Sequence, residues 1–172
     1  MKGPMDVHEA IRTRYAVRDF RPDPLPDETI TKILEAGRLA PSQQNRQQWH
    51  FVVVRDRETL KTVGELSPSG GFIAGAPMAV AVVMRGAKMA QVDAARAVEN
   101  MILAGWAEGA GTCWVSGIER DRVKALLDIP EDAELITILP FGYPARLSLQ
   151  GKKVRKPLSE VAHRERFGNP YS

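Results

Sequence analysis

The pattern of apolar and polar positions predicts short helices alternating with buried strands. Near the N-terminus, Val7, Ala10 and Ile11 recur at spacings of three and four, the helical period. A first helix is therefore expected over 6–14, with Asp6 as its N-cap. Three continuous apolar and β-branched runs are too short for amphipathic helices and predict buried strands. These runs are residues 49–55, 77–84 and 135–141.

Further helices are expected on either side of these strands. The second helix follows three closely spaced prolines, with Asp27 as a capping residue, and ends before Pro41. The others are expected over residues 57–66, 91–108 and 119–127, with a short one near 158–163. Helices come first, strands separated by helices follow, and no internal repeat interrupts the order. The expected fold class is α+β, in a single domain over 1–172.

Composition supports a folded chain and excludes several classes of protein. A 172-residue chain fits one domain that buries roughly 70% of its unfolded surface. Its 44% hydrophobic and 26% charged residues exclude disorder. No apolar stretch approaches the ~18 residues of a membrane span and no signal segment is visible, so we expect a cytoplasmic protein without a membrane partner.

Cysteine and histidine are too sparse to predict a disulfide or a metal centre. Cys113 is the only cysteine, which rules out an internal disulfide and a cysteine-built metal cage. The histidines, at 8, 50 and 163, lie far apart and lack the local pairing of metal ligands. Any redox chemistry of this chain therefore requires a bound cofactor.

The basic residues fall into two groups, one near each end of the chain. The net charge is +3 and the sequence pI is near 9.2. The groups are Arg12, Arg14, Arg18 and Arg21, and Lys152, Lys153, Arg155 and Lys156. Each is readily interpreted as solvated surface charge, but together they can also form an anion site from both ends of the chain. Since no nucleic-acid-reading motif or aromatic platform accompanies them, no nucleic-acid partner is expected.

Two segments suggest a ligand site, although the common catalytic motifs are absent. The chain has no Gly-x-Gly-x-x-Gly turn after a strand, Walker lysine loop, His-Glu-x-x-His or Gly-x-Ser-x-Gly. Arg14 and Arg18, followed by Phe20, place two guanidinium groups where the first helix ends, an arrangement suited to a phosphate. Residues 41–51 form a polar turn that leads directly into a strand. Each segment alone is also compatible with an ordinary loop.

Taken together with later segments, these two resemble the nitroreductase family of flavoproteins. The matching segments, in family order, are RYAVRDF at 14–20, APSQQNRQQWHF at 40–51, a helix bearing Asn100, GAGTCW at 109–114, GYPA at 142–145 and RKPL at 155–158. The order and spacing hold across nearly the whole chain. The resemblance implies a central mixed, mostly antiparallel sheet flanked by helices, in an intertwined homodimer whose tail, 143–172, packs on the partner subunit.

The resemblance also implies an FMN site at the subunit interface. In that arrangement the segment with Tyr15 and Ala16 borders the cofactor, Arg14 and Arg155 hold the FMN phosphate, and Arg18 reaches the ribityl and pyrimidine side. Four residues of the second subunit cover the isoalloxazine ring, and backbone donors of two further residues approach flavin N5. The four are Pro41, Ser42, Gln43 and Asn45, and the two are Ser116 and Gly117. No side-chain acid or base and no metal is required, because flavin N5 carries the chemistry.

The implied activity is hydride transfer from NADH or NADPH to a nitroaromatic, quinone or similar acceptor by a ping-pong mechanism. Two departures from the family pattern bear on it. Ala16 replaces a serine that would give the phosphate one hydroxyl, and Gln48 replaces the proline before Trp49. The short chain also implies an open site, and the loop at 67–71 is a candidate lid. A non-catalytic FMN-storage protein and a flavin-dependent dehydrogenase or dehalogenase are the alternatives.

Overall fold

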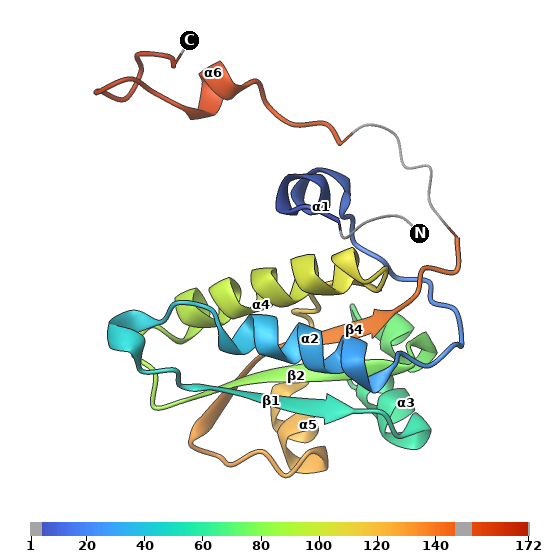
Figure 1. The fold of residues 1–172 in the computed structure, drawn as a ribbon. Helices are drawn as coiled ribbons and strands as arrows, with labels where there is room; N and C mark the ends of the chain where they lie inside the picture. Colours follow the sequence, from blue (N-terminus) through green and yellow to red (C-terminus); the bar gives the residue numbers. More distant parts are fainter. Residues whose placement is uncertain (1–4, 147–152, 172) are drawn as a thin grey trace.

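The computed structural model describes residues 5–146 and 153–171, and the body of the molecule is a sheet between two layers of helices (Figure 1). The sheet has four strands in the order β1-β2-β4-β3, and each neighbouring pair is antiparallel. Their bounds are β1 (Trp49–Val54), β2 (Met78–Arg85), β3 (Gly111–Thr112) and β4 (Ala133–Gly142).

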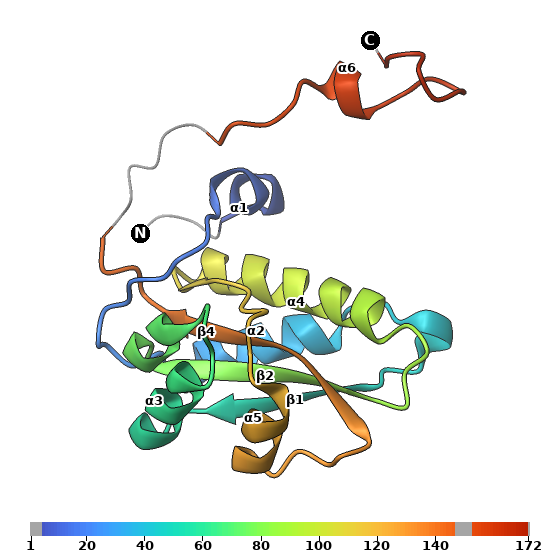
Figure 2. The same ribbon diagram turned by 180° about the vertical axis from the view of Figure 1, so that it is seen from behind.

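Helices cover both faces of this sheet (Figures 1 and 2). One face carries α2 (Asp27–Arg38) and α4 (Ala90–Ala107), and the other carries α3 (Arg57–Glu65), η2 (Gly71–Gly75) and α5 (Arg120–Leu126). Successive β2 side chains alternate between the two cores: Val80 and Val82 pack with α2 and α4, whereas Ala81 and Val83 pack on the opposite side. This double burial explains why β2 is a continuous apolar run.

Three short helical segments complete the structure: α1 (Val7–Thr13), η1 (Gln43–Asn45) and α6 (Leu158–Val161). The α1 helix stands above one end of α4, and residues 153–171 extend away from the body (Figures 1 and 2). Asp6 is the N-cap of α1, as predicted. Its carboxylate accepts hydrogen bonds from the backbone N–H groups of His8 and Glu9, which lower the pKa of Asp6.

The predicted α+β class is confirmed, and the predicted element boundaries agree within one or two residues. Three details need correction. Pro26 occupies the N-cap of α2, so Asp27 is its first residue instead. The β1 strand is only partly buried, because it lies at the sheet edge and pairs with β2 alone. The four strands of the implied mixed, mostly antiparallel sheet are all paired antiparallel, and parallel pairing in the described residues is confined to one isolated bridge, between Ala16 and Thr112.

Candidate functional site

The Arg14–Arg18 segment lies against the edge of the sheet formed by β3 and the residues that follow it. The backbone N–H of Val17 donates to the carbonyl of Thr112 at 3.0 Å, beside the Ala16–Thr112 bridge. A Cβ atom on Gly111 would lie 2.2 Å from a methyl carbon of Val17. Glycine at 111 is therefore what permits this close approach, which fixes the arginine segment on the sheet.

Three cations from opposite ends of the chain meet beside this segment. Arg14 is the C-cap residue of α1, and its Nε lies 3.5 Å from Oε1 of Glu99. Lys153 donates from Nζ to the carbonyl of Ile11 at 3.0 Å. Burial lowers the pKa of Lys153, and the positive charges of Arg14 and Arg155 lower it further, against the effect of Glu99. Arg14 and Arg155, from opposite ends of the chain, therefore both act electrostatically on Lys153, and such a local excess of positive charge suits a phosphate.

Tyr15 and Ala16 occupy different environments on this segment. The Tyr15 ring packs edge-on against Trp106, with centroids 5.0 Å apart, and its hydroxyl donates to the carbonyl of Arg146 at 3.4 Å. Trp106 in turn donates from Nε1 to the hydroxyl of Thr13 at 2.8 Å. Tyr15 therefore anchors the segment to the end of α4. Ala16 is exposed and offers no hydroxyl.

Arg18 points toward the η2 side of the site. Its guanidinium carbon lies 5.9 Å from the centre of the Phe72 ring. Burial raises the pKa of the Cys113 thiol, and the nearby charge of Arg18 opposes that increase. A raised pKa favours the protonated thiol, which is a poor nucleophile, so the buried Cys113 acts as a small packing residue.

Ser116 and Gly117 follow β3 and the isolated bridge that Val115 forms with Ile138 of β4. The backbone N–H of Gly117 donates to the hydroxyl of Ser69 at 3.1 Å, and a Cβ atom on Gly117 would lie 2.5 Å from that oxygen. Arg120 donates to the carbonyl of Ser116 at 3.4 Å. The 67–72 loop, the Arg14–Arg18 segment and the Gly117 amide consequently meet along one edge of the molecule.

The loop with Pro41, Ser42, Gln43 and Asn45 lies at the opposite end of α4. The backbone N–H of Gln43 lies 3.0 and 3.2 Å from the two carboxylate oxygens of Asp93, in the first turn of that helix. The Arg14–Arg18 segment is anchored instead through Trp106, which binds Thr13 and packs on Tyr15. Trp106 lies thirteen residues after Asp93 on α4. At 1.5 Å per residue this separation is about 20 Å. A single chain therefore does not bring the two groups of predicted site residues together.

The comparison with known proteins identifies the family and its fold. The Nitroreductase family model matches residues 11–87 and 68–143, which together cover most of the chain. The chain belongs to the nitroreductase family. A protein of Methanothermobacter thermautotrophicus, provisionally named NADH dehydrogenase/NAD(P)H nitroreductase, is 36% identical over 151 residues, covering 82% of this chain and 78% of that protein.

Two further relatives agree with this assignment. The FMN reductase [NAD(P)H] of Bacillus subtilis is 25% identical over 189 residues and covers 95% of this chain and 75% of its own length. A solved structure from Bacteroides thetaiotaomicron, with the same provisional name as the Methanothermobacter protein, superposes with a TM-score of 0.86 at 26% identity. The match covers 94% of this nitroreductase-family chain and 98% of the other.

The residues present fit FMN, the cofactor of this family. The Arg14, Lys153 and Arg155 cluster supplies the charge-assisted donors that a phosphate needs. Further along, the backbone N–H of Gly117 faces the hydroxyl of Ser69, and the absence of a side chain at 117 is what lets the 67–72 loop approach this amide. The residues that carry the family resemblance are therefore chemically suited to bind FMN.

The sequence assigned no individual role to three residues that lie in or behind this site: Lys153, which counted only among the basic residues of the tail, Ser69 and Asp93. Lys153 stands two positions before Arg155, a spacing that puts both side chains on one side of an extended segment. Ser69 lies in the loop flagged as a candidate lid. Asp93 gave no signal in the sequence, because a carboxylate in the first turn of a helix is usually an exposed, helix-stabilising residue, whereas this one is 2% exposed.

Proposed function

We propose that this chain transfers hydride from NADH or NADPH to a nitroaromatic, quinone or similar acceptor by a ping-pong mechanism, with FMN at the interface of a homodimer. At the coarser level, it is an NAD(P)H-dependent flavin oxidoreductase with FMN as its cofactor. The observation that carries the proposal is that one edge of the molecule holds both a group of cations from the two ends of the chain and the Gly117 amide, which donates to the hydroxyl of Ser69.

When bound, FMN supplies N5, the atom that accepts a hydride and passes it on. The protein's own residues position the cofactor and stabilise its negative charges. Arg14 and Arg155 hold the phosphate through charge-assisted hydrogen bonds, with Lys153 adding a third charge. Arg18, oriented toward Phe72 and Cys113, places a fixed cation on the pyrimidine side. Tyr15 and Ala16 border the phosphate, and Tyr15 anchors that segment on Trp106.

Ser116 and Gly117 present the backbone donor to N5. For the Gly117 N–H to reach a ligand, it must leave the hydroxyl of Ser69 or share its hydrogen between the two acceptors. Because this donor is a main-chain group two residues after the Val115–Ile138 bridge, its position does not depend on a rotamer of its own residue. Positioning of this kind can account for a large part of the rate enhancement without an acid or a base from the protein.

The homodimer is proposed from two observations of the single chain. First, the loop with Pro41, Ser42, Gln43 and Asn45 is held at Asp93 near the start of α4, whereas Tyr15 is anchored on Trp106 about 20 Å further along the helix, so a second copy must supply the loop to cover the ring. Second, several large apolar side chains are exposed on the segments that a partner would meet. They are Val7, Ile11, Leu39, Met89, Val92 and, in the tail, Val154, Leu158, Val161 and Phe167.

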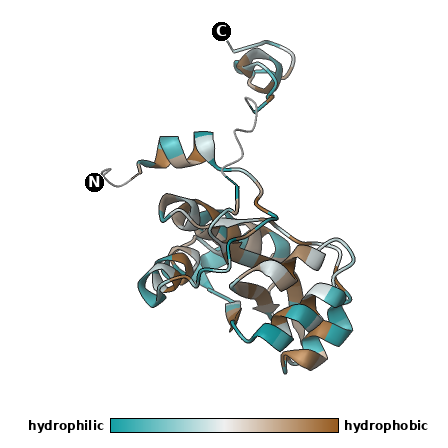
Figure 3. Ribbon diagram, turned by 90° about the vertical axis from the view of Figure 1, so that its right-hand side faces the viewer, coloured by the Kyte–Doolittle hydropathy of each residue, from teal (hydrophilic) through white to brown (hydrophobic). Residues whose placement is uncertain are grey.

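The distribution of these side chains supports the same arrangement. The α1 helix stands away from the body although it carries hydrophobic as well as hydrophilic residues (Figure 3). Phe167, in the extended tail, is 94% exposed. Such surfaces are typical of segments that are buried by another subunit. We therefore propose that the described part of the tail packs on the partner. Residues 147–152, with Lys152 among them, lie outside the described part of the chain.

The visible absorption spectrum of the purified protein, taken before and after anaerobic addition of NADH or NADPH, tests the proposal. Flavin bands that bleach on addition and recover when a quinone or nitroaromatic is admitted are the expected result. Colour that does not bleach with either nucleotide would favour an FMN-storage protein instead. A colourless protein that also fails to take up added FMN would contradict the assignment of the site.

A further inference from the structure

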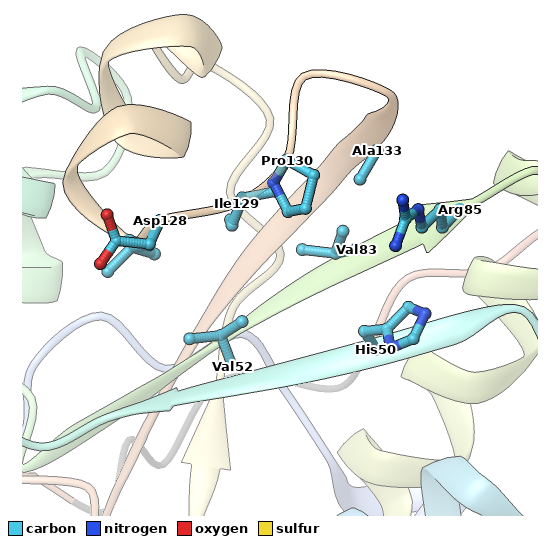
Figure 4. Close-up of a pocket in the computed structure, with 9 residues that line it drawn as sticks. His50, Val52, Val83, Arg85, Asp128, Ile129, Pro130 and Ala133 are labelled. Carbon is cyan, nitrogen blue, oxygen red and sulfur yellow. The ribbon is translucent and has the colours of Figure 1, made fainter.

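A separate cavity of about 180 Å³ opens on the α5 side of the sheet, beyond the C-terminal end of α5 (Figure 4). It shares no residue with the proposed FMN site. Its lining is mostly apolar, with three polar side chains at the rim. The lining residues are His50, Val52, Val83, Arg85, Leu127, Asp128, Ile129, Pro130 and Ala133.

The cavity follows from the alternation of the strands and from the point at which α5 ends. Cross-strand pairing sets His50 opposite Val83 and Arg85 opposite Ala133, so that these side chains share one face of the sheet. The α5 helix stops at Leu126, and the turn that follows it covers this face only in part. Because the residue at 133 is a small alanine, the space beneath the turn is not filled.

Two donor groups stand together at one side of this cavity. Arg85 uses Nε to bind Oδ2 of Asp132 at 2.8 Å. Among the residues that the structure describes, neither the terminal nitrogens of Arg85 nor the ring nitrogens of His50 have a hydrogen-bond partner. Figure 4 shows both side chains on the same side of the cavity and Asp128 on the opposite side. The cavity therefore has hydrogen-bond donors on the side of Arg85 and His50 and an apolar floor.

We propose that this cavity binds a small monocarboxylate whose apolar body is about the size of one aromatic ring. The size follows from the volume, since an apolar cavity of about 150 Å³ accepts benzene. The carboxylate would receive hydrogen bonds from the terminal nitrogens of Arg85 and from His50, in the planar geometry that a guanidinium favours. Asp132 neutralises part of the arginine's charge, and Asp128 repels a second anionic group, so a dicarboxylate is disfavoured.

The probe for this proposal is benzoate, titrated into the full chain in its purified, cofactor-containing form and followed by amide chemical shifts. We expect saturable shifts at Val52, Val83 and Ile129, and about tenfold weaker binding of the uncharged isostere benzyl alcohol. Ala133→Leu should abolish the binding by filling the cavity. Arg85→Gln should weaken benzoate about tenfold and leave benzyl alcohol unchanged.

Arg55→Gln is the matched control, because Arg55 lies just beyond the other end of β1, forms a similar exposed ion pair with Asp27 and does not line the cavity. It should leave benzoate affinity unchanged. The proposal is overturned if benzoate produces no saturable shifts, if Arg85→Gln behaves like Arg55→Gln, or if the shifts appear only around Ser116 and Gly117. The last result would place benzoate in the flavin site alone. Should Ala133→Leu not fold, the Arg85 and Arg55 variants decide the question, since both residues are exposed.

Discussion

The two halves of the proposed flavin site are built differently. The Arg14–Arg18 half is fixed by main-chain hydrogen bonds to the sheet, such as that between Val17 and Thr112. The Pro41–Asn45 half is held largely by side chains: the carboxylate of Asp93 accepts from Gln43, and the hydroxyl of Ser42 accepts from the N–H of Gln47. The chemistry thus rests on a rigid sheet edge, whereas the covering loop depends on a few replaceable side chains.

Backbone conformation sharpens the contrast. In the covering loop, Gln44, Asn45 and Gln47 all have positive φ, between 51° and 56°. Asparagine tolerates this region, but each glutamine there costs on the order of 1 kcal/mol. In the Arg14–Arg18 half, the described residues show no such conformation. The loop therefore carries strain that its anchors must offset, and variants in the two halves should fail in different ways.

Arg14→Ala should have the largest effect on FMN. Loss of a charge-assisted hydrogen bond to phosphate should weaken FMN binding about tenfold to a hundredfold, while the sheet edge stays intact. The measurement is the ratio of flavin to protein absorbance in the purified variant, followed by titration with FMN. Arg12→Ala is the control, because Arg12 is exposed on the same helix. A variant at Arg14 that retained full FMN would remove the phosphate role assigned to this residue.

Asp93→Ala should damage the covering loop and leave the phosphate cluster unchanged. The buried carboxylate holds the Gln43 N–H and pairs with Arg96 at 3.1 Å. Leaving a fully buried donor without its acceptor costs about 1–3 kcal/mol, and the part-buried Gln43 N–H should lie at the low end of that range. We expect a lower melting temperature and weaker dimers by analytical ultracentrifugation. Asp121→Ala, at an exposed acid in the first turn of α5, should change neither. Unchanged dimer affinity would show that the loop does not lie at the interface.

Much of the fold could be predicted from sequence because local physics decides it. The β2 run reads as a buried strand since both of its faces are apolar, and Asp6 reads as an N-cap since its carboxylate precedes a helical pattern. The edge position of β1 could not be predicted in this way. Its sequence resembles that of β2, and only the pairing of the sheet leaves His50 exposed.

In the candidate site, too, some features could be predicted from local sequence and others depend on long-range contacts. The cationic character of Arg14 and Arg155 is visible in the sequence, and the clustering of basic residues at both ends suggested a shared anion site. The contribution of Lys153 and the use of Ser69 by Gly117 depend on long-range contacts, spanning 142 residues between Lys153 and Ile11 and 48 between Gly117 and Ser69. No local pattern encodes such contacts. The roles of the individual residues toward FMN stay predictions.

Lys153 should make FMN binding depend on pH. Its pKa in the free protein is lowered by burial and by Arg14 and Arg155, and a bound phosphate would raise it again. As the pH rises through the lowered pKa, the ammonium loses its proton and one attraction to the phosphate disappears, so affinity falls toward alkaline pH. Fluorescence titrations across that range should show a several-fold loss, which Lys153→Met should lack. Parallel curves for the two proteins would exclude a direct charge role for Lys153.

Ala16→Ser should have the smallest effect and the opposite sign. Ala16 is exposed beside Thr112 on the rigid half, so a serine there can place a hydroxyl near the phosphate without disturbing the core. A hydrogen bond to a charged group contributes about 1.5–3 kcal/mol when fully formed, and exposure to water reduces this. We expect FMN to bind roughly threefold to tenfold more tightly by titration. Ala145→Ser, at another exposed alanine, should have no effect. Because the rigid half has a fixed backbone, unchanged or weaker binding in Ala16→Ser would mean that the phosphate lies elsewhere along this edge.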